Sequence, residues 1–152
     1  MCIRDRDIII HAVDIWQGVP IGQFWKNVKL ANCDKIIKPI KKDSADTAAD
    51  FKDGSVDFVF VDADHSYDAC NRDIVNWLPK LKEKGWMAGH DYFEGAVIKA
   101  VRNTFGKGVE GFWLARDEGR QIQNNCKSWL VKDAVERVRT RKYLQTFDEY
   151  GG

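Results

Sequence analysis

Residues 56–65 decide the fold: they read Val-Asp-Phe-Val-Phe-Val-Asp-Ala-Asp-His. The first six are mostly β-branched or aromatic and form the strongest strand pattern in the chain. We expect this strand to stop at Asp62, where polar residues take over. Because ligands bind beyond the carboxyl ends of strands in open α/β sheets, the polar residues that follow are the first candidates for a functional site.

Strand and helix patterns alternate on both sides of this stretch. Further strands are expected at residues 8–13, 36–40, 86–89, 109–115 and 128–131, and helices at about 20–31, 44–51, 67–78, 96–105 and 133–147. The alternation predicts an α/β fold, a mostly parallel sheet with helices on both faces. The polar stretch between the last two strands is too short for a packed crossover helix, which predicts a C-terminal antiparallel pair.

Two strand patterns carry further expectations. Residues 8–13 are almost all apolar and predict a buried parallel strand that ends at Asp14, with His11 as a core residue. Pro39 cannot donate to a sheet ladder, so the strand at 36–40 is expected at a sheet edge. Gly85 is expected to turn the chain into the strand at 86–89.

The length and the net charge of the chain limit the classes of protein to which it can belong. The 152 residues fit one domain, which we place at residues 7–152, with 1–6 as a foreign or disordered leader. Lys and Arg total 24 and Asp and Glu total 23, so a formal charge of +1 provides no global attraction for nucleic acid or membranes. A basic run near the end is interpreted as the solvated face of a terminal helix. It comprises Arg137, Arg139, Arg141 and Lys142.

The cysteines form no metal or disulfide pattern. Cys2, Cys33, Cys70 and Cys126 lie far apart in the sequence, without a Cys-x-x-Cys pair. Free thiols are typical of a reducing cytoplasm, where we expect the protein to act. No apolar run approaches the roughly 18 residues of a membrane span, and the first residues lack a signal-peptide core.

Polar residues follow four of the expected strands. They are Asp14, residues 43–45 (Asp-Ser-Ala), residues 62–65 (Asp-Ala-Asp-His) and residues 89–92 (Gly-His-Asp-Tyr). Neighbouring strands lie about 4.8 Å apart, so the two segments with an Asp and a His are expected to gather in one cleft. The alternative is that Asp14 caps its own loop and that the other acids are ordinary loop residues.

Two of these segments resemble a known family. Residues 62–67, Asp-Ala-Asp-His-Ser-Tyr, and 89–92, Gly-His-Asp-Tyr, are similar to the motifs of small Rossmann-like class I S-adenosylmethionine-dependent methyltransferases. Residues 12–18, Ala-Val-Asp-Ile-Trp-Gln-Gly, resemble that family's second strand, and 43–45 resemble the loop after its third. The resemblance runs in order from about residue 7 to 132, and the two central motifs are its specific part.

The resemblance implies that the chain begins after the family's first strand. The glycine-rich loop that follows that strand would also be missing, and no Gly-x-Gly-x-Gly run occurs in the sequence. The absence would expose ladder groups of the neighbouring strands or force them to pair directly. We therefore expect this chain by itself to be marginally stable and inactive.

The resemblance also assigns the cofactor, S-adenosylmethionine. Asp14 would accept hydrogen bonds from the two ribose hydroxyls, and Trp16 would flank the ribose or adenine. Ser44 and the backbone of Ala45 would meet the adenine, and Asp62 would lie below the sulfonium. Methyl transfer then depends on the in-line positioning of acceptor, carbon and sulfur.

The acceptor, which we expect to be a small molecule with a hydroxyl oxygen, must also lose a proton. His65 or His90 is the expected catalytic base, with His65 preferred because it follows the acidic loop directly. Related oxygen methyltransferases hold a divalent ion such as Mg²⁺ at positions that match Asp62 and Asp91. Tyr92 stands where a third ligand often lies, so metal dependence stays open; His90 as a substitute would favour a softer ion.

Two other function classes stay open. A metal-dependent hydrolase would use the same acids and histidines around an activated water. Its ligands would be Asp62, Asp64, His65, His90 and Asp91. A noncatalytic binding module is the second alternative, for which the missing loop is the best argument. Binding of the adenosyl cofactor would distinguish a methyltransferase from a hydrolase. An upstream coding sequence with a strand and a glycine-rich turn would distinguish a methyltransferase from a binding module.

Overall fold

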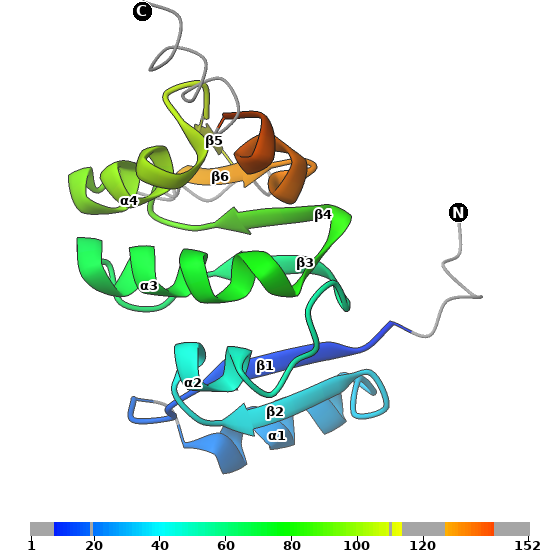
Figure 1. Ribbon diagram of the computed structural model, residues 1–152. Coiled ribbons are helices and arrows are strands. Elements are labelled where there is room, and N and C mark those ends of the chain that lie inside the picture. Colours follow the sequence, from blue (N-terminus) through cyan, green and yellow to red (C-terminus); the bar gives the residue numbers. More distant parts are fainter. Residues whose placement is uncertain (1–7, 19, 110, 114–126, 142–152) are drawn as a thin grey trace, which may run out of the picture. The chain divides into compact units, whose positions relative to one another are not determined.

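The computed structural model describes residues 8–18, 20–109, 111–113 and 127–141 (Figure 1). The chain forms two compact units, Met1–Thr47 and Ala48–Gly152. Each unit has its own sheet, a two-stranded one in the first and a four-stranded one in the second. The proposed leader at 1–6 lies outside the described residues.

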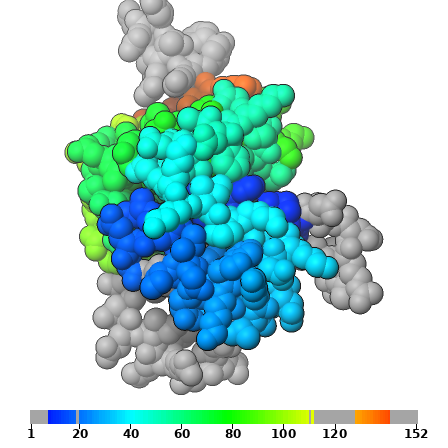
Figure 2. Space-filling model, turned by 90° about the horizontal axis from the view of Figure 1, so that it is seen from below, coloured from blue at the N-terminus to red at the C-terminus, as the bar shows by residue number. Residues whose placement is uncertain are grey.

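Unit 1 is a small β-α-β arrangement. It consists of β1 (Ile10–Asp14), α1 (Ile21–Leu30), β2 (Ile37–Lys41) and most of α2 (Ser44–Ala48). The two strands are parallel, with Ile10 opposite Ile37 and Asp14 opposite Lys41. The helix α1 buries Val28, while its other residues are exposed or half-buried. Figure 2 shows one side of this unit at the surface, in blue.

The predicted burial of the first strand is wrong. Ile8, Ile9 and Ile10 are 42%, 49% and 48% exposed, and His11 is also exposed instead of lying in a core. The physical reason is pairing: among the described residues, β1 has only β2 as a sheet neighbour. A two-stranded sheet in a small unit has few elements that can cover its faces.

Unit 2 continues the α/β alternation and ends in antiparallel strands. Its elements are β3 (Val56–Val61), α3 (Tyr67–Trp77), the 3₁₀ turn η1 (Leu78–Lys80), β4 (Leu81–Gly89), α4 (Gly95–Phe105), β5 (Gly111–Trp113), β6 (Lys127–Val131) and a helix at 134–141. The sheet order is β3-β4-β6-β5, with β3 and β4 parallel and β6 antiparallel to both β4 and β5. The predicted α/β class and the antiparallel pair are confirmed.

The core of unit 2 lies between the sheet and the helices α3 and α4, which run side by side in Figure 1. Ile74, Met87 and Trp129 are fully buried. Phe105 packs against Trp129 with ring centroids 6.2 Å apart. Pro79 lies just beyond the end of α3, where the chain continues as η1, because a proline inside a helix removes a backbone hydrogen bond. These contacts fix the ends of β3 and β4, which carry the polar motifs.

The strand β4 is longer than the sequence predicts. Val56 pairs with Leu81 but Phe58 pairs with Trp86, so residues 82–85 bulge out of the ladder between them. Gly85 lies at the end of this bulge, and a Cβ there would be 2.9 Å from the Lys82 carbonyl oxygen. The predicted turn is thus a bulge within one strand.

The three arginines of the basic run lie on the helix at 134–141, where Arg139 is exposed and Arg137 and Arg141 are half-buried. Arg137 donates from Nε to the Phe105 carbonyl oxygen at 3.0 Å, and Arg139 pairs with Glu83 at 3.0 Å. Arg141 donates to the carbonyl oxygen of Asn103 at 2.5 Å. Lys142 and the remainder of the predicted helix lie outside the described residues. These arginines therefore hold neighbouring chain segments.

None of the described helices is long and apolar enough to cross a membrane. Cys33 and Cys70, the two cysteines in the described part of the chain, are free thiols. Cys2 and Cys126 lie outside it.

Candidate active site

The polar motifs meet where β3 and β4 end. Val61 pairs with Gly89, so Asp62 and His90 leave the sheet side by side. The His90 amide continues the ladder by donating to the Val61 carbonyl oxygen at 3.1 Å. This approach requires glycine at 89, since a Cβ there would lie 2.5 Å from the Val61 oxygen and 2.7 Å from the Trp129 ring.

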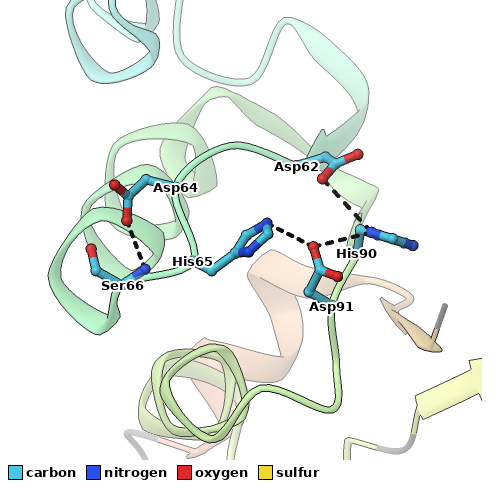
Figure 3. A network of polar contacts seen from close by, with 6 residues as sticks. All are labelled: Asp62, Asp64, His65, Ser66, His90 and Asp91. Carbon is cyan, nitrogen blue, oxygen red and sulfur yellow. Dashed lines mark hydrogen bonds and ion pairs between the residues drawn. The ribbon is translucent and has the colours of Figure 1, made fainter. Parts of the chain in front are cut away.

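Asp91 is the centre of the cluster (Figure 3). Its Oδ2 lies 2.8 Å from His65 Nε2 and 3.1 Å from His90 Nδ1, so two imidazoles converge on one oxygen. His90 Nδ1 is also 3.8 Å from Asp62 Oδ1. Asp91 is buried and has a φ of 54°, which is uncommon for a residue other than glycine. The predicted gathering of the two Asp–His segments is confirmed.

The loop after Asp62 turns Asp64 away from this cluster (Figure 3). Asp64 Oδ1 accepts a hydrogen bond from the Ser66 amide at 2.7 Å, and Ser66 Oγ caps α3 by accepting from the Ala69 amide. Hydrogen bonds from the Ser66 side chain and backbone lower the pKa of the Asp64 carboxyl. Asp64 therefore shapes the loop that presents His65, and the five-ligand set expected for a hydrolase is not assembled.

Tyr92 has a structural role. Its ring is buried, and its hydroxyl donates to the Val109 carbonyl oxygen at 2.8 Å. This bond ties the loop after β4 to the segment that leads into β5. Tyr92 is thus committed to a contact inside unit 2.

In unit 1, Asp14 and Trp16 form one local arrangement at the end of β1. Asp14 Oδ1 accepts a hydrogen bond from the Trp16 amide at 2.5 Å. Trp16 has a φ of 57°, donates from Nε1 to the Ile40 carbonyl oxygen at 3.3 Å and packs on Phe24 with ring centroids 4.7 Å apart. The loop-capping role considered for Asp14 is present, and it fixes one oxygen of an exposed carboxylate.

Ser44 and Ala45 lie at the start of α2, where Asp43 is the cap. Asp43 Oδ1 accepts from the Ala45 amide at 2.9 Å and from the Asp46 amide at 3.3 Å. The Ala45 N–H is thus already engaged. Any contact of the Ala45 backbone with an adenine would have to use the carbonyl oxygen or displace Asp43.

The predicted residues therefore fall into two groups. Unit 2 brings together Asp62, His65, His90 and Asp91, and unit 1 carries Asp14, Trp16, Ser44 and Ala45. Sequence reasoning missed that Asp91 contacts both histidines. Because Asp91 and the two histidines follow the ends of adjacent strands, the sequence indicates that they lie close together. Which side chains are in contact depends on the loop conformation that Asp64 and Ser66 set.

Asp62, His65 and Asp91 also form a group that could hold a cation. Each offers one ligand atom, and the three atoms lie within 4.8 Å of one another. Two carboxylate oxygens and one imidazole nitrogen are a donor set that fits a divalent metal ion.

The α/β order and the polar cluster at the ends of two parallel strands define a Rossmann-like fold of the class I methyltransferase type. The sequence model of a family described as a methyltransferase domain matches residues 2–92, which include both central motifs. The chain belongs to this methyltransferase domain family.

Solved structures share the fold. A protein from Corynebacterium glutamicum has a TM-score of 0.63 at 12% identity, over 82% of this chain and 60% of that one. A SAM-dependent O-methyltransferase from Thermotoga maritima has a TM-score of 0.61 at 13% identity, over 82% of this chain and 49% of that one. At such identities the likeness concerns the fold alone.

A curated relative is similar in sequence. The uncharacterized protein y4gI of Sinorhizobium fredii is 31% identical over 87 residues. The alignment covers 53% of this chain and 10% of that protein, so the chain spans about a tenth of the relative's length.

Proposed function

We propose that this chain serves the transfer of a methyl group from S-adenosylmethionine to a small-molecule acceptor, at a hydroxyl oxygen, and that it binds the cofactor but is inactive by itself. The observation that carries the proposal is the cluster of Asp62, His65, His90 and Asp91 at the carboxyl ends of β3 and β4. Membership of a methyltransferase domain family supports the reaction type. The free thiols of Cys33 and Cys70 support a cytoplasmic location as part of the same proposal.

The cofactor residues follow from the family resemblance. Asp14 would accept from the ribose hydroxyls with the oxygen that the Trp16 amide leaves open, and Trp16 would border the adenosyl group. Ser44 and Ala45 would lie against the adenine. Asp62 would contribute a negative charge toward the sulfonium.

Proton removal is the task of the histidines. When bound, S-adenosylmethionine would supply an activated methyl group, whose transfer would form an oxygen–carbon bond, break the carbon–sulfur bond and release a neutral thioether. The acceptor hydroxyl gives its proton to an imidazole, for which His65 and His90 are the candidates. Asp91, whose Oδ2 contacts both rings, would orient the base and stabilise the imidazolium that forms.

A divalent metal ion is also part of the proposal, with Asp62 and Asp91 among its ligands. Such an ion would orient an acceptor hydroxyl and make it more acidic. The donor set in unit 2 supports this, since the two carboxylates and His65 already converge.

Cofactor binding tests the proposal. S-adenosylhomocysteine is titrated into the 152-residue chain by isothermal titration calorimetry. We expect saturable binding that Asp14→Asn weakens at least about tenfold, which is the loss of roughly one charge-assisted hydrogen bond. Asp34→Asn, at another exposed acid of unit 1, is the matched control and should bind as the parent does. Absence of binding, or equal binding by the Asp14 variant, would overturn the proposal.

A further inference from the structure

We infer that Asp62, His65 and Asp91 form a mixed oxygen and nitrogen site for a divalent first-row transition metal ion rather than for Mg²⁺. The inference rests on the proposed function for its place beside the reaction, and it changes two parts of that proposal. It names the class of metal ion. It also assigns His65 to the metal and His90 to the proton of the acceptor.

The geometry of the three side chains is close to that of a filled site. Their ligand atoms lie within 4.8 Å of one another, and His65 Nε2 is 2.8 Å from Asp91 Oδ2. Ligand atoms at about 2.0–2.2 Å from a common ion lie up to about 4.4 Å apart, so the cluster needs only a small adjustment. All three residues belong to unit 2 and follow the ends of adjacent, hydrogen-bonded strands.

Exposure of the ligands gives an ion a route to the site. The side chain of Asp91 is 11% exposed and anchors the cluster, while that of His65 is 53% exposed. Asp62 is exposed as well. An ion can therefore arrive from solvent, replace the proton that now links His65 to Asp91, and leave the buried carboxylate compensated.

The ligand types decide which ion is preferred. Mg²⁺ takes oxygen ligands almost exclusively and keeps several waters, whereas imidazole suits transition metal ions. A site with one imidazole and two carboxylates therefore discriminates against Mg²⁺. Tyr92, whose hydroxyl is committed to Val109, supplies no compensating oxygen.

The assignment also separates the two histidines. With His65 as a ligand, His90 remains to accept the proton of the acceptor. Its Nδ1 is 3.1 Å from Asp91 Oδ2, so the carboxylate can still orient the ring.

Metal titration in the absence of any adenosyl ligand tests the inference. Free Mn²⁺ is followed by electron paramagnetic resonance as the full chain is added, and Mg²⁺ is used as a competitor. We use Mn²⁺ because it binds cysteine thiols weakly. We expect one Mn²⁺ per chain, bound at least about tenfold more tightly than Mg²⁺, because an imidazole ligand discriminates between them.

Substitutions identify the nitrogen ligand. His65→Gln should lower Mn²⁺ affinity at least about tenfold, since loss of even an outer partner of a metal site costs about 10- to 100-fold. The same variant should also lose the nitrogen coupling in pulsed electron paramagnetic resonance spectra of bound Mn²⁺. His65→Asp, which replaces the imidazole by a carboxylate, should lower the ratio of Mn²⁺ affinity to Mg²⁺ affinity. His11→Gln is the matched control, in the exposed histidine of β1, and should change neither quantity.

Several outcomes would overturn the inference. They are no Mn²⁺ binding, equal affinity for Mg²⁺, or nitrogen coupling that survives His65→Gln but disappears in His90→Gln. Because these readings need no adenosyl compound, a failed metal site and a failed cofactor site are separate results.

Discussion

At the scale of single residues, the site depends on close contacts that the sequence only hints at. Asp91 and His65 are 26 positions apart, and their 2.8 Å contact requires both a parallel strand pair and the Asp64–Ser66 loop bond. The acidic and histidine motifs predict that ionisable groups gather. They do not predict which oxygen meets which ring nitrogen, because that depends on side-chain rotamers and loop conformation.

Gly89 offers a direct test of the strand-end geometry. Gly89→Ala should destabilise the protein by about 1–3 kcal/mol, as overpacking in a filled core does, because the new methyl group meets the Val61 carbonyl oxygen and the Trp129 ring. Urea denaturation measures the change. Gly95→Ala is the control, because a Cβ there has no atom within 4 Å. Equal stability of the two variants would contradict the packing at the end of β3 and β4.

Cys70 should be an unreactive thiol. Burial, with Asp73 nearby as a second cause, raises its pKa from 9.0 to about 11, so little thiolate forms near neutral pH. Iodoacetamide at pH 8 should modify Cys33 well before Cys70, as peptide mass spectrometry can show. Since the unfolded thiol ionises first, the stability that this shift contributes is complete below pH 9 and is lost as pH rises toward 11. A Cys70→Ala variant should lack that loss, and rapid labelling of Cys70 in the native protein would disagree with its burial.

At the scale of helices and strands, local patterns predict more than pairing does. The α3 helix, the break at Pro79 and α4 follow from apolar spacing and proline chemistry, which act within a few residues. The burial of β1 and the bulge at 82–85 could not be predicted in this way. Both depend on which strand lies next to which, and a sequence window carries no information on that partner.

Tyr92 tests how the loop after β4 is held. Tyr92→Phe removes the hydroxyl that donates to the Val109 carbonyl oxygen and leaves that buried region one hydrogen bond short. We expect a loss of about 1 kcal/mol in unfolding free energy. Tyr67→Phe, in a half-buried tyrosine of α3, should change stability much less. A Tyr92 variant with parental stability would mean that the loop is fixed by ring packing alone.

At the scale of the whole molecule, the charge and the apolar surface give different information. The near-neutral formal charge predicts no broad basic field. In the structure, Arg137 and Arg139 of the last described helix contact Phe105 and Glu83. The apolar surface was not predicted. Phe58, Phe60 and Trp86 are 51%, 46% and 41% exposed on the sheet of unit 2.

This aromatic surface should be measurable in solution. Phe58 and Phe60 lie on the same face of β3 with ring centroids 6.5 Å apart, and Phe58 is opposite Trp86. A contiguous apolar patch binds dyes such as anilinonaphthalene sulfonate, whereas single exposed residues do not. We expect the native chain to enhance the dye's fluorescence, and Phe58→Thr with Phe60→Thr to remove most of that signal, because threonine keeps strand propensity while it shrinks the apolar surface. Leu30→Thr, at an isolated residue that is 72% exposed, is the control and should leave the signal intact. If the dye responds equally to all three proteins, the aromatic side chains are covered in solution and the face of β3 is not the open surface described above.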